Sequence, residues 1–187
     1  MADEKVPGER FCLYDTAALA AVLDRMAREA FPLLAGAEEP LLLGILRRGA
    51  PLAEMLQARL KANHGCDVPR YAMKLKRYGD DLTLLHADTQ LTENAEFDAR
   101  DLSRATVLMV DDVLYQGHSL ARLQAYLTGR GAPVIRAAVL ADRCCAVLPM
   151  KADIVGVHLQ VAPSDVVECN VPPYEETFRI EVLRPQR

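Results

Sequence analysis

The sequence has no tryptophan, and aromatic residues make up only 5% of its 187 residues, so its hydrophobic core must be largely aliphatic. Lysine and arginine number 22 against 26 aspartate and glutamate residues, which gives a formal net charge of −4. A general nucleic-acid-binding protein usually has the opposite balance. The composition therefore argues against that class, although it leaves room for a local basic patch. With 51% hydrophobic and 26% charged residues, the chain suits one globular domain.

Long apolar runs and closely spaced cysteine pairs are also missing. No apolar stretch approaches the roughly 18 residues that a membrane span needs, and the opening MADEKVPGERF is polar, unlike a secretory signal. We therefore expect a cytoplasmic protein without a membrane partner. The five cysteines include no Cys-x-x-Cys pair, so the sequence predicts reduced thiols and no zinc site.

Apolar spacing predicts alternating helices and strands. Helices are expected over residues 16–31, 51–60 and 119–128. Strands are expected over 41–46, 71–75, 106–110, 134–140 and 154–157, with an edge strand over 178–182. This order implies an α/β fold whose mostly parallel central sheet is flanked by helices. Ligands bind such sheets at the carboxyl ends of the strands.

A long polar segment, residues 77–104, interrupts this alternation. Loops of this length within compact domains are often functional lids, or they contain a hairpin. We therefore expect this segment to be a mobile lid.

The run TVLMVDDVLYQGHS, residues 106–119, carries the clearest chemical pattern. Asp111 and Asp112 follow an apolar strand, and a short loop then enters a helix. Unpaired N–H groups and the helix dipole favour an anion at such a helix start, and Gly117 allows the backbone to approach a phosphate. Loop and carboxylates together would fit a group with a phosphate at one end and hydroxyls at the other, such as phosphoribose.

Other interpretations of the charged residues stay open at this point. An acidic pair can hold Mg²⁺ in P-loop enzymes, but the sequence has no G-x-x-x-x-G-K-[ST] motif. It can also be a phospho-acceptor site, which response regulators usually place near their first strand. Arg47-Arg48 can be solvated charges at a strand end and Asp80-Asp81 an ordinary loop pair, while Arg143 alone indicates nothing.

The run VLMVDDVLYQGHS resembles the signature for phosphoribosyl pyrophosphate in type I phosphoribosyltransferases. Its Asp-Asp-Val-Leu-Tyr form most resembles the pyrimidine-operon attenuation regulators that are also uracil phosphoribosyltransferases. Three further stretches agree in order and spacing: Gly44-Ile45 with Arg48-Gly49, Arg77 through Asp80-Asp81-Leu82, and Ala141-Asp142-Arg143 with Leu148-Pro149 and Ala152-Asp153. The resemblance spans residues 17–161. It implies one domain over 1–187, with the lid at 77–104 and a small base-side hood with the C-terminal strand at 142–187.

The resemblance also implies a role for each matching residue. Asp111 and Asp112 would hold the ribose hydroxyls, and Arg48 would act with them in catalysis. Gly49 would line the pyrophosphate site with Arg48, and Arg143 and Val155 would border the base. The loop that cradles the 5-phosphate would consist of Gln116, Gly117, His118 and Ser119, and the lid would carry Arg77, Asp80 and Asp81. Arg47 and Tyr115 are further substrate-binding positions. Mg²⁺ would be carried mainly by the substrate, near the acidic pair, rather than by the protein alone.

The implied reaction is transfer of phosphoribose from phosphoribosyl pyrophosphate to uracil, giving UMP and pyrophosphate. A purine (hypoxanthine or guanine) phosphoribosyltransferase and a non-catalytic, nucleotide-sensing RNA-binding regulator are the alternatives. The expected partners are phosphoribosyl pyrophosphate, uracil or another nucleobase, a pyrimidine leader mRNA, and further copies of the chain in a homo-oligomer.

The chain departs from the family pattern at several positions. The family has Thr-Gly-Arg-Thr where Gln116-Gly117-His118-Ser119 stands, which predicts weakened phosphate binding. It has Thr-Arg in place of Arg47-Arg48, and Pro-Thr in place of Gln160-Val161, which leaves the base undecided. The regulators carry basic residues after the Asp-Arg pair, where this chain has Cys144, Cys145 and Ala146. We therefore expect RNA binding to be weak or lost while transfer is retained.

Overall fold

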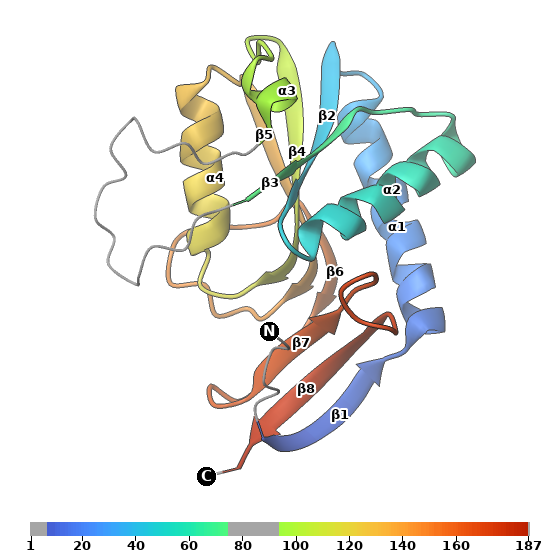
Figure 1. Cartoon of the computed structure of the whole chain (residues 1–187), viewed down its shortest axis with the longest axis vertical. Coiled ribbons are helices and arrows are strands. Elements are labelled where there is room, and N and C mark those ends of the chain that lie inside the picture. Colours follow the sequence, from blue (N-terminus) through green and yellow to red (C-terminus); the bar gives the residue numbers. More distant parts are fainter. Residues whose placement is uncertain (1–6, 75–93, 187) are drawn as a thin grey trace.

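The computed structural model describes residues 7–74 and 94–186 (Figure 1). Its elements in chain order are β1 (Gly8–Tyr14), α1 (Thr16–Leu34), β2 (Glu39–Ile45), α2 (Gly49–His64), β3 (Arg70–Met73), α3 (Ala95–Asp98), β4 (Ala105–Leu114), α4 (His118–Gly129), β5 (Val134–Asp142), β6 (Ile154–His158), β7 (Val166–Asn170) and β8 (Arg179–Pro185). None of the described helices is both long and apolar enough to cross a membrane.

The larger sheet has five strands in the order β3-β2-β4-β5-β6, and all of its paired strands are parallel. The helices α1 and α2 cover one face and α4 covers the other (Figure 1). Successive side chains of a strand point to opposite faces. Along β4, Leu108 and Val110 accordingly join the core under α1 and α2, whereas Val107 and Met109 join the core under α4. The sequence of a strand that is buried on both faces is a continuous apolar run. The predicted α/β fold is confirmed.

The smaller sheet corrects the prediction for the end of the chain. It has three antiparallel strands in the order β1-β8-β7, so β8 is a central strand and not an edge strand. Its partners β1 and β7 were not predicted. β1 lacks a clear apolar alternation because much of it is exposed, including 38% of Phe11 and 45% of Leu13. On the inner side, Val167, Ile180 and Val182 complete the core under α1.

The predicted lid overlaps the described residues only at 94–104, where the chain is packed against the domain. Residues 75–93, with Arg77, Asp80 and Asp81, lie outside the described residues. Phe97 of α3 is fully buried, and its ring centroid lies 5.3 Å from that of Tyr71 in β3. Asn94 caps the short helix by accepting a hydrogen bond from the Phe97 N–H at 3.1 Å.

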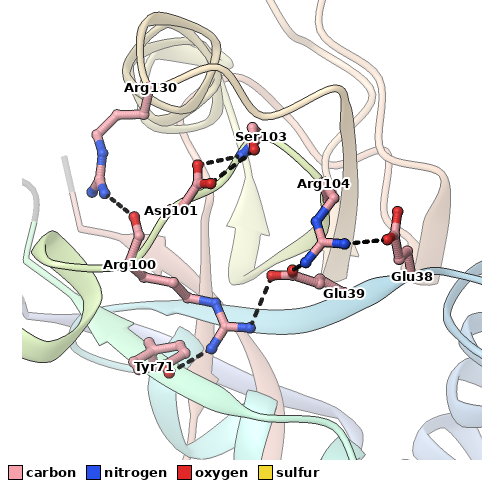
Figure 2. A network of polar contacts seen from close by, with 8 residues as sticks. All are labelled: Glu38, Glu39, Tyr71, Arg100, Asp101, Ser103, Arg104 and Arg130. Atoms are coloured by element: carbon pink, nitrogen blue, oxygen red, sulfur yellow. Dashed lines mark hydrogen bonds and ion pairs between the residues drawn. The ribbon is translucent and has the colours of Figure 1, made fainter.

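A polar network holds this part of the chain in place (Figure 2). Arg100 donates to the Tyr71 hydroxyl at 3.2 Å and pairs with Glu39 at 3.4 Å. Arg104 pairs with Glu39 at 2.7 Å, and Arg130 of α4 donates to the Arg100 carbonyl at 2.6 Å. These contacts join residues 94–104 to β2, β3 and α4, and the mobility of the lid stays a prediction.

We expect Phe97→Leu to lower the free energy of unfolding by about 1 kcal/mol, because the smaller side chain fits the buried site imperfectly. Glu96→Ala, on the exposed side of the same helix, should change it by less than about 0.5 kcal/mol. Urea denaturation measures both. Equal stability of the Phe97 variant and the parent would show that this segment is not anchored in solution.

Candidate active site

The acidic pair lies on β4, the central strand of the parallel sheet. The strand continues through Leu114, past the predicted end at Val110, and carries Asp111 and Asp112 towards its carboxyl end. Asp111 is 9% exposed, and its Oδ1 accepts a hydrogen bond from the Asp112 N–H at 2.9 Å. The pairing of β4 with β2 ends at Val110, whereas its pairing with β5 continues past the acidic pair, from Asp111–Val139 to Leu114–Asp142.

Burial raises the pKa of Asp112, although hydrogen bonding to Asp111 and the charge of Arg48 act to lower it. Behind Asp112, the buried Cys169 thiol of β7 lies 3.8 Å from the Asp112 carbonyl oxygen. Burial and then the charge of Asp112 raise the pKa of this thiol well above its usual value. The Cys169 thiol is therefore uncharged, while Arg48 supplies the positive charge that acts on Asp112.

Arg48 precedes α2 and is held by a residue that the sequence did not indicate. Its Nη2 lies 2.5 Å from Glu175 Oε1, and its Nε donates to the same oxygen at 3.1 Å. Glu175 also accepts from the Val171 N–H at 2.8 Å. Hydrogen bonding to Glu175 raises the pKa of Arg48 against the effect of burial. Burial acts to raise the pKa of Glu175, but the hydrogen bonds from Arg48 and Val171 lower it overall.

The neighbouring Arg47 lies over the ring of Tyr174, with its guanidinium carbon 5.5 Å from the ring centroid. Arg47 and Arg48 are thus both in contact with the segment between β7 and β8. Tyr174 and Glu175 lie beyond residue 161, where the resemblance ended, so only the fold could bring them to the site.

Gly49 brings the start of α2 directly against β4. A Cβ atom at this position would lie 2.3 Å from the Val110 carbonyl oxygen and 3.1 Å from the Asp111 Cα. Backbone atoms cannot rotate away from such a contact as a flexible side chain can. The absence of a side chain at Gly49 therefore sets how closely Arg48 approaches the acidic pair.

The loop after β4 ends at Gly117, the N-cap of α4, whose φ of 91° favours glycine. Because Gly117 has no side chain, the N-cap residue accepts no side-chain hydrogen bond from the amide groups at the start of α4. The Gln116 carbonyl accepts from Val147 N–H at 3.2 Å and from Leu148 N–H at 3.3 Å, which fixes the loop. The loop, with His118 and Ser119 in the first turn of α4, places the start of α4 at the carboxyl end of β4, where an anion is favoured.

The two residues predicted to border the base, Arg143 and Val155, have different surroundings. The Arg143 guanidinium carbon lies 4.5 Å from the Tyr115 ring centroid, and Arg143 Nη2 donates to the Asp165 carbonyl at 2.9 Å. Val155 lies inside β6, and its carbonyl accepts from Arg25 of α1 at 3.0 Å. Val155 pairs with Val139 inside the sheet, whereas Arg143 follows the end of β5. The role of Val155 at the base therefore stays a prediction.

The described residues thus bring together an acidic pair at the end of β4, an arginine at the start of α2 and a helix start at α4. The chain matches the phosphoribosyl transferase domain family over residues 12–177. It is 39% identical over 148 residues to the Bifunctional protein PyrR of Deinococcus deserti, which covers 78% of this chain and 79% of that protein.

The Bifunctional protein PyrR of Deinococcus radiodurans is 35% identical over 165 residues, covering 88% of this chain and 89% of that protein. A solved hypoxanthine phosphoribosyltransferase from Trypanosoma cruzi superposes with a TM-score of 0.75, covering 95% of this chain and 92% of its own. At 20% identity that likeness shows the fold alone. The chain therefore belongs to the phosphoribosyl transferase family and, within it, to the PyrR proteins.

Proposed function

We propose that this chain transfers the phosphoribosyl group of phosphoribosyl pyrophosphate to uracil, forming UMP and pyrophosphate. By family the chain is a phosphoribosyltransferase. The observation that carries the proposal is the placement of the Asp111–Asp112 pair and the start of α4 on the same strand end. The carboxylates would accept hydrogen bonds from the ribose hydroxyls, and the amides of α4 would bind the 5-phosphate.

Arg48 would supply positive charge to the leaving pyrophosphate from the opposite side of the acidic pair. Loss of pyrophosphate builds positive charge on the ribose, as in glycoside cleavage. Carboxylates fixed beside that carbon stabilise the charge without forming a bond to it. Catalysis would thus depend on positioning and electrostatics, and the mechanism requires no covalent nucleophile.

The same carboxylates fit Mg²⁺, which takes oxygen ligands and is usually bound through one or two carboxylates together with substrate phosphates. When bound with the substrate, Mg²⁺ would neutralise charge on the leaving pyrophosphate. Asp111 and Asp112 would orient the complex of Mg²⁺ and substrate. The buried backbone of β4 would hold both carboxylates in fixed positions beside that complex.

We also propose that binding to a pyrimidine leader mRNA is weak or lost. Phosphate contacts in such complexes come from lysine and arginine. The basic side chain of Arg25 on α1 is already bonded to the carbonyls of Val155 and Gly156 and to Glu29. A gel-shift titration at physiological salt tests this proposal, and nanomolar affinity with a steep salt dependence would contradict it.

Pyrophosphate release, measured with uracil, hypoxanthine and guanine in the presence of Mg²⁺, tests the proposed reaction. We expect turnover with uracil. Faster turnover with hypoxanthine or guanine would assign a purine substrate instead. If no base supports turnover while UMP still binds, the chain is a nucleotide sensor without transferase activity.

Because Glu175 neutralises Arg48, we expect Glu175→Gln to lower the KM for phosphoribosyl pyrophosphate. The effect should be about two- to fivefold, equivalent to the roughly 0.4–1 kcal/mol of a partly exposed ion pair. The matched control is Glu168→Gln, because Glu168 pairs with Arg10 at 2.9 Å in the same small sheet. A raised KM in the Glu175 variant would show that this carboxylate positions Arg48 for the substrate rather than competing with it.

A further inference from the structure

Three potential metal ligands meet beside the base-side residues, at the carboxyl ends of β5 and β6. Asp142 ends β5 and His158 ends β6, and the two are paired in register across the parallel sheet. Cys144 follows two residues after Asp142. One carboxylate oxygen, one thiol sulfur and one imidazole nitrogen of these residues all lie within 4.8 Å of one another.

The separations of these atoms are close to those of a tetrahedral transition-metal site. With metal–sulfur and metal–nitrogen bonds of about 2.3 and 2.05 Å, the sulfur and nitrogen are about 3.6 Å apart. Cys144 Sγ lies 3.6 Å from His158 Nδ1. The matching nitrogen–oxygen separation is about 3.4 Å, and His158 Nδ1 lies 3.8 Å from Asp142 Oδ2. These two separations need shifts of only a few tenths of an ångström, and the sulfur and the carboxylate oxygen lie within 4.8 Å of each other.

The backbone at Cys144 supports a function for its side chain. Among the described residues, Cys144 is the one non-glycine residue with a positive φ, 53°. This conformation is uncommon for a residue with a side chain, and a conformation of this kind held in place often marks a functional site. The Cys144 N–H donates to Asp142 Oδ1 at 2.7 Å, and this bond keeps the thiol beside His158.

We propose that Asp142, Cys144 and His158 form a binding site for a divalent transition-metal ion such as Zn²⁺. The mixture of sulfur, nitrogen and oxygen ligands suits that class, whereas Mg²⁺ and Ca²⁺ take oxygen ligands alone. Binding would form three metal–ligand bonds and release the thiol proton to solvent. A carboxylate, a thiolate and a neutral imidazole balance the two positive charges of the ion.

The site is open to solvent, and three protein ligands leave a fourth position for water or another ligand. The His158 side chain is 66% exposed, so an ion can reach it directly. A bound ion would link the ends of β5 and β6 to the turn that follows Arg143. The proposal is independent of the transferase reaction, because none of its three ligands belongs to the acidic pair or the phosphate loop.

Cobalt titration of the reduced, untagged full chain tests this assignment. Thiolate-bound Co²⁺ gives a sulfur-to-metal charge-transfer band, and four-coordinate Co²⁺ gives intense visible bands. We expect one Co²⁺ per chain with both features, and displacement of the cobalt by Zn²⁺. Cys144→Ser should abolish the charge-transfer band, and His158→Ala should weaken cobalt binding at least tenfold.

Cys145→Ser is the matched control, because Cys145 is exposed and its Sγ faces the Tyr115 carbonyl at 4.0 Å rather than the cluster. It should keep the spectrum of the parent chain. Far-ultraviolet circular dichroism establishes that each variant is folded. The proposal is overturned if the parent shows no charge-transfer band, if Cys144→Ser retains it, or if Cys145→Ser loses it.

Discussion

Replacing Asp111 and Asp112 together by asparagine should reduce phosphoribosyl transfer by about 100-fold or more. Each substitution removes a charged hydrogen-bond acceptor, and hydrogen bonds to charged groups contribute roughly 1.5–3 kcal/mol each. The same change removes negative charge from beside the carbon on which positive charge develops. Steady-state kinetics with phosphoribosyl pyrophosphate and uracil measures the loss.

The folded state should tolerate this substitution. Since burial raises the pKa of Asp112, the folded state favours its protonated form. A carboxyl group with a raised pKa stabilises the fold when protonated, and this contribution is lost as the pH rises through the folded-state pKa. At a pH above that pKa the ionised Asp112 opposes folding, so asparagine should leave the urea midpoint unchanged or higher there. Near-normal transfer in a folded double variant would refute the proposed role of the pair.

Gly49→Ala should damage both stability and activity, although it adds only one methyl group. The new Cβ would lie 2.3 Å from the Val110 carbonyl oxygen, so α2 must move away from β4. Overpacking of this kind costs about 1–3 kcal/mol. Because Arg48 would move with α2, we expect transfer to fall by about tenfold or more, as small misplacements of catalytic groups have large effects.

Gly129→Ala is the control for the Gly49 variant. Gly129 is the last residue of α4. Apart from its two chain neighbours and the backbone of its own helix, no heavy atom lies within 4 Å of a Cβ added there. Alanine is favoured over glycine in helices by up to about 1 kcal/mol, so this variant should be as stable as the parent or more stable. A normal Gly49→Ala enzyme would mean that α2 does not set the position of Arg48.

The parallel sheet could be predicted because its strands are buried on both faces and interrupted by amphipathic helices. The run from 107 to 110 is apolar at every position, and this signal does not depend on distant partners. Asp111 and Asp112 lie towards the carboxyl end of this strand and Gly117 at the start of the next helix, as expected from the sequence, while their roles stay predictions. Local sequence carries this information because each feature belongs to one strand–turn–helix unit.

The features that were missed depend on contacts between distant segments. β1 is largely exposed and becomes a strand by pairing with β8, far along the chain. Glu175 reaches Arg48 because the small sheet stands beside the start of α2. The polar composition of residues 94–104 indicated a loop, whereas one buried ring, Phe97, and several arginine side chains attach them to the domain.

The small sheet also orders events during synthesis. β1 leaves the ribosome before every other described element, yet its hydrogen-bonding partner β8 leaves last. The parallel sheet can assemble in the meantime, since domains begin to fold while the chain is still growing. Until β8 arrives, the hydrogen-bonding edge that β1 later pairs with β8 is open to other chains. Chaperones that bind unpaired strands would therefore bind residues 8–14 before any other described element.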